Sequence, residues 1–398
     1  DLATLFRIAT RYGYIFDLER EYGINLRALF TFADQHYEAD PFFYPKAGEF
    51  NQQNADLLSK VHQALTIIQF KLEGQIIARQ PDFEMENRLF LQQAVTGAVE
   101  IDGRTYPLSH GCFQTVDPQH PYELTAEEQE VIQSLGYSFR HAPQIKAHMD
   151  FILRKGSMYL IYNNNLLYHG CIPLTEDGDF DEFEYRGHRY AGRKLLDFFE
   201  QRIRAATSKT DFTETDDTDL MWYCWIGKKS PLFGRTAMTT FERYFIDDKK
   251  THREGDNPYF MLRDRLSTAH YILDKFGLDE RSSYIINGHT PVKVGNGESP
   301  IKGGGQILVI DGGLSKAYQK ATGIAGYTLI NNSYGFQIVT HTPFLGVAEL
   351  YNSTTGSATL KRVIDRDLPR RNIADTTIGM ELKRQIDDLK FLLQNDDN

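Results

Sequence analysis

Residues 284–313 read YIINGHTPVKVGNGESPIKGGGQILVIDGG and contain two short apolar runs that each end in a polar turn. The first run is followed by Asn287, Gly288 and His289, and the second by Asp311. Short apolar runs bounded by glycine and polar residues are typical of buried strands. Together with the helical patterns elsewhere in the chain, these strands predict a domain of the α/β or α+β class.

A second segment, residues 158–173, has the same arrangement. It reads MYLIYNNNLLYHGCIP and predicts a strand, a turn at 163–165, and a second strand that ends before His169 and Gly170. Glycine lets the backbone bend sharply and approach another group closely. A histidine at a strand end can direct a ring nitrogen into the cleft where α/β proteins bind ligands, and neutral imidazole is the commonest metal ligand. His169 and His289 are therefore candidate metal ligands, and the alternative is that each is a polar surface residue.

Two other histidines occur in similar local sequence. His110 lies in SHGCF, but no apolar strand precedes it, so we interpret it as a loop residue. His341 lies in QIVTHTPF after a predicted strand but lacks the preceding glycine, and it stays an alternative site residue.

Helical periodicity dominates the two ends of the chain. Apolar residues recur at three- and four-residue steps in residues 53–78, which predicts a long core helix, and residues 379–394 predict an amphipathic helix. We expect a mainly helical part at 1–95, mixed strands and helices carrying the site at 96–350, and a helical tail at 351–398.

Composition limits the possible partners. The 398 residues are 41% hydrophobic and 25% charged, with a net charge of −10. A nucleic-acid binder needs a basic face, so this charge argues against one. There is no apolar run of the about 20 residues that a membrane helix needs. Three widely spaced cysteines do not make a disulfide framework, and a reducing cytoplasm is the expected setting.

Several longer motifs carry a family resemblance. NGHTPVK, GESPIK, VIDGG, SKAYQ, TGIAGYTLINNSYG, SPLFG and MTTFERYF resemble the class III fructose-1,6-bisphosphatases of bacteria, which belong to the calcineurin-like metallophosphoesterase superfamily. The resemblance covers essentially the whole chain. It implies a β-sandwich flanked by helices and a dinuclear site of Mn²⁺ or Mg²⁺ with His169 and His289 among its ligands. It also implies hydrolysis of the 1-phosphate of fructose 1,6-bisphosphate to fructose 6-phosphate in gluconeogenesis.

The chain departs from the family pattern in its acidic metal-binding motifs. The Asp-x-His spelled by Asp34 and His36 has no strand before it, and no Gly-Asn-His exists in the sequence. In the family these motifs precede the segments matched here. We therefore expect the C-terminal portion of a longer enzyme, inactive alone, which needs an N-terminal segment that supplies the remaining ligands and the general acid.

The second phosphate of a sugar bisphosphate needs lysine or arginine. The candidates near the motifs are Lys293, Arg235, Lys302 and Lys316. Glycines 303–305 could direct backbone N–H groups at an anion. The alternative is that these are solvated charges and a flexible turn.

Two other functions stay open from the sequence. The chain could be a non-catalytic fragment that binds a sugar phosphate or a nucleotide, or a metallophosphoesterase with another substrate. A homo-oligomer is also expected, because residues 379–394 form an amphipathic helix.

Overall fold

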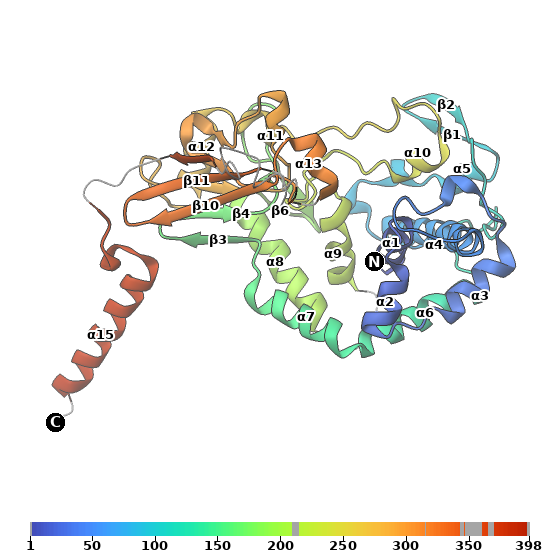
Figure 1. Cartoon of the computed structure of the whole chain (residues 1–398), viewed down its shortest axis with the longest axis horizontal. Helices are drawn as coiled ribbons and strands as arrows, with labels where there is room; N and C mark the ends of the chain where they lie inside the picture. Colours follow the sequence, from blue (N-terminus) through green and yellow to red (C-terminus); the bar gives the residue numbers. More distant parts are fainter. Residues whose placement is uncertain are drawn as a thin grey trace.

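The computed structural model describes residues 2–208, 215–314, 316–342, 346, 360–364 and 370–395. The chain is a mixed α+β protein, which confirms the predicted class. The N-terminal helices gather at one end of the molecule, and the largest sheets lie at the other end with further helices around them (Figure 1). The helical end is built from α1 (Leu2–Arg11), α2 (Ile15–Tyr22), α3 (Arg27–His36), α4 (Gln52–Arg79), α5 (Leu91–Ala94), α6 (Ala126–His141) and α7 (Pro143–Lys155).

Helix α4 forms the centre of this end, as the periodicity predicted. The side chain of Asn51 caps it by accepting a hydrogen bond from the backbone N–H of Asn54. Most residues between Leu58 and Ile77 are buried, because α1 and α3 pack against the helix. A large apolar cluster joins these helices to α10 (Thr240–Phe245).

A five-stranded sheet carries the two predicted histidine corners. Its strand order is β3–β4–β7–β9–β8, with bounds β3 (Tyr159–Tyr162), β4 (Asn165–Tyr168), β7 (Ile285–Asn287), β8 (Ile301–Lys302) and β9 (Ile307–Val309). Strands β4, β7 and β9 are parallel, and the two outer strands are antiparallel to their neighbours. The three parallel strands are therefore the centre of the sheet.

Three smaller sheets complete the strands of the described residues. They comprise the hairpin β1 (Ala98–Ile101) and β2 (Arg104–Pro107), the hairpin β5 (Phe183–Tyr185) and β6 (His188–Tyr190), and the antiparallel sheet β10 (Gly326–Asn332), β11 (Gly335–His341) and β12 (Leu360–Val363). Phe336 of β11 shares a small apolar cluster with Ile286 and Leu308 of the five-stranded sheet. The described residues form several small sheets and do not show the β-sandwich that the resemblance implied.

The remaining helices cover the five-stranded sheet or follow it. They are α8 (Gly192–Ser208), α9 (Asp216–Ile226), α11 (Tyr259–Leu262), α12 (Leu266–Lys275), α13 (Lys316–Thr322) and α15 (Thr377–Asn395). A second large apolar cluster joins α8, α9 and α12 to strands β4, β7 and β9. Among the described helices, none is both long and apolar enough to cross a membrane.

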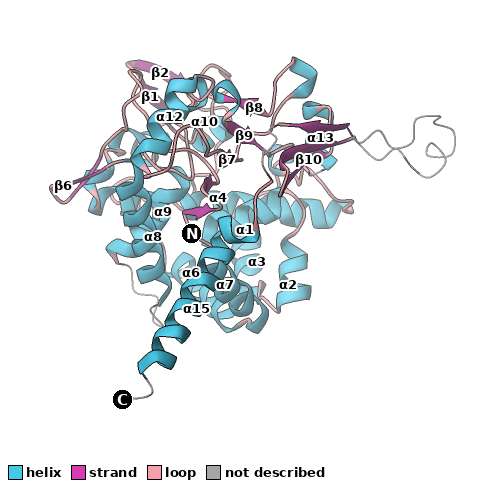
Figure 2. Cartoon of the chain, turned by 90° about the vertical axis from the view of Figure 1, so that its left-hand side faces the viewer, coloured by secondary structure: helices cyan, strands magenta, loops and turns pink. Residues whose placement is uncertain are grey.

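Helix α15 projects away from the rest of the molecule (Figures 1 and 2). Its first residue, Thr377, exchanges two hydrogen bonds with Asn163 in the β3–β4 turn. Its apolar side chains, including Leu382, Ile386 and Leu389, are about half exposed or more. Within the expected tail, α15 is preceded by the strand β12, and residues 347–359, 365–369 and 396–398 lie outside the described part. The limits of the three expected parts and an oligomer formed through α15 stay predictions.

Candidate metal and phosphate site

The candidate site lies where the parallel strands β4, β7 and β9 end. His169 directly follows β4, His289 lies two residues after β7, and Asp311 lies two residues after β9. Because the strands are parallel and adjacent, their carboxyl ends meet at one edge of the sheet. The fold thus brings together two histidines that are 120 positions apart in sequence.

The two imidazole rings face each other at this edge. Nδ1 of His289 lies 3.3 Å from Nε2 of His169, and the ring planes are nearly perpendicular at 89°. The other nitrogen of His289, Nε2, lies 3.0 Å from the backbone oxygen of Phe233. A carbonyl can only accept, so this contact places the proton of the neutral ring on Nε2 and leaves the Nδ1 lone pair directed at His169.

We expected the glycine beside each histidine to provide both the sharp bend and the close approach, and the backbone at the two corners differs from this. His289 itself takes the left-handed conformation, with φ of 70°. A Cβ on Gly288 would make only ordinary contacts, 3.7 Å from both Asp311 and His169. A Cβ on Gly170 would lie 2.2 Å from the backbone oxygen of Pro231. The close approach therefore depends on Gly170, and the strained backbone belongs to a residue whose side chain forms the site.

Partial burial and neighbouring charges make His289 a weaker base. Burial is the largest cause of its lowered pKa, and the nearby His169 and Arg235 act in the same direction. The Phe233 carbonyl and Asp311 oppose this shift. One carboxylate oxygen of Asp311 accepts a hydrogen bond from the backbone N–H of Gly313 at 2.9 Å, so Asp311 is also a turn residue. A lowered pKa keeps the imidazole neutral, which is the form that binds metals.

Of the four predicted phosphate-binding cations, Arg235 is the one whose charge lowers the pKa of His289. Its Nη1 donates to Glu254 at 2.9 Å. Asp256 lies farther from the guanidinium, with 4.0 Å between its Oδ1 and Nε. Arg235 thus lies two residues after Phe233, whose carbonyl contacts His289, and its guanidinium is partly occupied by the Glu254 carboxylate.

The three predicted lysines lie in different places. Lys293 is exposed, four residues after His289, and its backbone N–H donates to Glu298. Lys302 is paired in register with the first residue of β9, so it lies at the opposite end of the strand from the histidines. Its ammonium donates to Asp264 at 2.8 Å. Lys316 is the first residue of α13.

The adjacent glycines 303–305 also lie near the start of β9. They form a short turn that packs against α12, where a Cβ on Gly304 would lie 3.1 Å from Leu266. The structure therefore places this turn away from the histidine pair.

The other histidines with similar local sequence have different ring contacts. His110 stacks on Phe42 with ring centres 3.9 Å apart, and His341 on β11 contacts the hydroxyl of Thr328 at 2.8 Å. His36, of the Asp-x-His in α3, pairs with Glu127. Each of these rings is engaged within its own part of the fold.

Two residues that sequence reasoning missed shape the site. Phe233 supplies the carbonyl that orients His289, and the ring of Phe260 stacks against His289 with ring centres 6.2 Å apart. Every residue has a backbone carbonyl and phenylalanine is common in cores, so no local signal marks these two positions.

The donor set fits one part of a divalent-metal site. Two ring nitrogens converge, and one is oriented by a backbone carbonyl, as is usual for histidine ligands. Within the described ranges, no group of three or more histidine, cysteine or acidic side chains could hold a metal ion. The histidine pair therefore needs further ligands to form a complete site.

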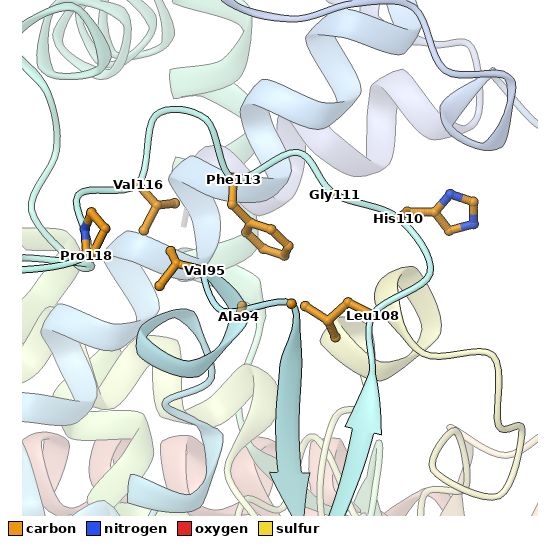
Figure 3. A pocket seen from close by; sticks show the side chains of 9 residues that line it. Ala94, Val95, Leu108, His110, Gly111, Phe113, Val116 and Pro118 are labelled. Atoms are coloured by element: carbon orange, nitrogen blue, oxygen red, sulfur yellow. The ribbon is translucent and has the colours of Figure 1, made fainter.

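A pocket of about 380 Å³ lies beside the β1–β2 hairpin, at the helical end of the molecule. Figure 3 shows Phe113, Leu108 and Val116 around it, with the His110 ring pointing away. The residues that line it are Ala94, Val95, Gly97, Leu108, His110, Gly111, Phe113, Val116 and Pro118. It has no lysine or arginine in its lining, so it lacks the cations that a sugar bisphosphate needs.

Comparison with known proteins agrees with the motifs quoted above. The profile of the family described as Firmicute fructose-1,6-bisphosphatase matches residues 1–398. A class 3 fructose-1,6-bisphosphatase of Pediococcus pentosaceus is 78% identical over 396 residues, which is 100% of this chain and 62% of that protein. Class 3 enzymes of Streptococcus sanguinis and Staphylococcus aureus are each 49% identical and align over 98% and 99% of this chain.

The chain spans about 62% of the length of the curated relatives it matches. No solved structure matches it. The match with the family profile extends over every residue of the sequence, including both histidine corners. The chain therefore belongs to the Firmicute fructose-1,6-bisphosphatase family.

Proposed function

We propose that this chain is part of a metal-dependent enzyme that hydrolyses the 1-phosphate of fructose 1,6-bisphosphate to fructose 6-phosphate. The observation that carries the proposal is the convergence of His169 Nε2 and His289 Nδ1 at the ends of two parallel strands. The substrate is supported by the relatives, which are named as class 3 fructose-1,6-bisphosphatases. This reaction is a step of gluconeogenesis.

In this proposal, His169 and His289 hold a divalent metal, Mn²⁺ or Mg²⁺. His289 binds through Nδ1, because the Phe233 carbonyl holds the proton at Nε2. When bound, the metal would supply Lewis-acid stabilisation of the transferred phosphoryl group. The two histidines keep neutral rings in a fixed orientation, and Gly170 lets the first corner lie against Pro231.

Arg235 and Lys293 are the proposed phosphate contacts of this chain. The charge of Arg235 influences His289, and a phosphate that binds to Arg235 would compete with Glu254 for its guanidinium. Lys293 follows the same corner, and its exposed ammonium makes no hydrogen bond or ion pair with another described residue. Lys302 is farther away and already paired with Asp264, so we give it no phosphate contact, and Lys316 stays a candidate through its position at the start of α13.

The remaining metal ligands are proposed to come from polypeptide outside these 398 residues. Two imidazoles cannot fix a pair of metal ions, and the chain is shorter than its relatives. The chain alone is then expected to bind Mn²⁺ weakly and to release no phosphate.

The test compares the 398-residue chain with a polypeptide that has the full length of the relatives. Phosphate release from fructose 1,6-bisphosphate with Mn²⁺ is measured for both, and Mn²⁺ binding is measured by calorimetry. We expect activity and tight binding only in the longer protein. Manganese-dependent hydrolysis by the 398 residues alone would contradict the need for further ligands.

The same experiment separates the second candidate function, which is sugar-phosphate binding without catalysis. That candidate is favoured by the incomplete donor set of the described residues. It would be supported if the full-length protein bound fructose 1,6-bisphosphate and did not hydrolyse it. Hydrolysis of other phosphate esters at a higher rate would instead indicate a metallophosphoesterase with another substrate.

A further inference from the structure

Arg263 is a buried cation that is linked to the histidine pair through the ring of Phe260. Its side chain follows α11 and the residue is only 6% exposed. The guanidinium carbon lies 5.0 Å from the centre of the Phe260 ring. Its Nε and Nη1 atoms are closed off from solvent and donate no hydrogen bond within the part of the chain that the structure describes.

An arginine in this state is energetically unfavourable. A guanidinium stays charged in proteins, and a buried charge without a partner costs several kcal/mol. The carboxylates near it in sequence are engaged elsewhere, because Asp264 accepts from Lys302 and Glu254 accepts from Arg235. The contact with Phe260 stabilises a desolvated cation by only about 2 kcal/mol. Arg263 therefore needs an anion that the described residues do not supply.

Other polar groups surround the same position. The Arg263 charge acts on the Cys171 thiol, opposing the burial that raises its pKa, and it also acts on Tyr168 and Tyr259. The two tyrosine hydroxyls lie 2.7 Å apart. The side-chain oxygen of Asn287, a 2% exposed residue of β7, is a further buried atom without a partner.

Phe260 connects this group to the histidine pair. Its ring contacts the guanidinium of Arg263 and also stacks against the imidazole of His289. Tyr168, the last residue of β4, directly precedes His169. The half-buried Phe260 ring is therefore in contact with both the guanidinium and one ring of the histidine pair.

We propose that Arg263 binds a phosphoryl group in an inner subsite that is linked to the histidine pair through Phe260. The inference rests on the proposed function for the class of ligand, a sugar phosphate. The planar guanidinium presents N–H donors in the arrangement that phosphate oxygens accept. A sugar hydroxyl could donate to the unpaired oxygen of Asn287.

The test is thermal unfolding of the 398-residue chain in a phosphate-free buffer, then with inorganic phosphate or fructose 1,6-bisphosphate. Arg263→Met removes the guanidinium, and Arg265→Met is the matched control, since Arg265 is exposed and lies two residues away. We expect saturating phosphate to raise the midpoint of the wild type and of R265M by roughly 2 °C or more. We expect no rise in R263M. Without phosphate, R263M should unfold at the same temperature as the wild type or higher, because an unpaired charge has been removed.

Fructose 1,6-bisphosphate should raise the wild-type midpoint at a lower concentration than inorganic phosphate, which identifies a sugar phosphate as the ligand. An equal response to both ligands overturns that identification. The inference as a whole is overturned if the wild type shows no phosphate-dependent shift. It is also overturned if R263M keeps the full shift, since phosphate binding would then not need the guanidinium.

If R263M does not fold, Arg263→Lys tests the same inference, because lysine keeps the positive charge but lacks the planar guanidinium. A reduced shift in R263K supports the subsite, and an unchanged shift overturns it. No readout here involves hydrolysis. If the full-length protein hydrolyses the sugar bisphosphate but R263M keeps its phosphate shift, only the subsite is contradicted. If the full-length protein does not hydrolyse it but R263M loses the shift, only the proposed function is contradicted.

Discussion

The helical end and the strand edge use histidine in opposite ways. His62 on α4 is fully buried, and its two ring nitrogens contact the Phe43 carbonyl at 2.9 Å and the Tyr244 hydroxyl at 2.7 Å. His289 is partly exposed and has one nitrogen held by a carbonyl, while the other faces His169. The comparison teaches that a polar group satisfied within the core contributes to folding. A histidine such as His289, with one ring nitrogen facing a second histidine, can instead bind a metal ion.

The same contrast holds for the charged residues. Lys71 and Glu128 form a completely buried ion pair at 2.7 Å, and both side chains have further partners in Thr115. Arg263 is almost as buried, but the Nε and Nη1 atoms of its side chain donate no hydrogen bond to any described residue. The buried ion pair of the helical end is thus satisfied by its own neighbours, whereas two guanidinium nitrogens of Arg263 are not.

The largest expected effect tests the buried ion pair of the helical end. Lys71→Met leaves the Glu128 carboxylate buried without a counter-charge, and we expect a loss of about 3–5 kcal/mol in the free energy of unfolding. Denaturant unfolding measures it. The double variant Lys71→Met with Glu128→Gln should regain a substantial part, because no buried charge remains.

Lys60→Met is the matched control for that experiment. Lys60 pairs with Asp34, whose side chain is 67% exposed, so its loss should cost at most about 1 kcal/mol. Equal effects of the two lysine variants would remove the contrast between the buried pair and the exposed one.

The next effect tests the strand edge. In the full-length protein, His169→Ala or His289→Ala should lower activity with Mn²⁺ by about 100-fold or more, since each removes a proposed ligand. Steady-state phosphate release and Mn²⁺ titration measure it. His110→Ala is the control and should leave both unchanged, because the His110 ring stacks on Phe42 at the helical end. A loss in all three variants would point to a general fold defect.

A smaller effect concerns pH. Burial lowers the pKa of His62 from 6.5 to about 3. Between these values the unfolded chain binds a proton that the folded chain does not, so this contribution to stability is complete above pH 6.5 and is lost as the pH falls. The free energy of unfolding should drop by about 1.4 kcal/mol per pH unit below pH 6 from this group alone. The variant His62→Gln should show a flatter dependence between pH 6 and pH 5, and an unchanged slope would mean that other groups cause it.

The last prediction compares the two glycine corners. Gly170→Ala places a methyl group against the Pro231 oxygen and should cost about 1–3 kcal/mol. Gly288→Ala meets only ordinary contacts and should cost less than about 1 kcal/mol. Urea unfolding of both variants gives the comparison, and a larger loss for Gly288→Ala would reverse our assignment of the close approach.

Local patterns were sufficient to predict the main elements and the two corners. The strands before His169 and His289 follow from short apolar runs ended by glycine, and α4 follows from apolar residues at helical spacing. Motif resemblance also led to the family that the comparisons show. The resemblance did not extend to the β-sandwich, since the described strands form several small sheets.

The sequence by itself determined which residues end the strands, because hydrophobic periodicity and turn residues act over a few positions. Only the tertiary structure decided that His169 and His289 meet, since this requires β4 and β7 to pair in parallel across more than a hundred residues. The same holds for the Phe233 carbonyl on His289 and for the burial of Arg263 behind Phe260. These contacts depend on how distant segments pack, and no short stretch of sequence encodes such packing.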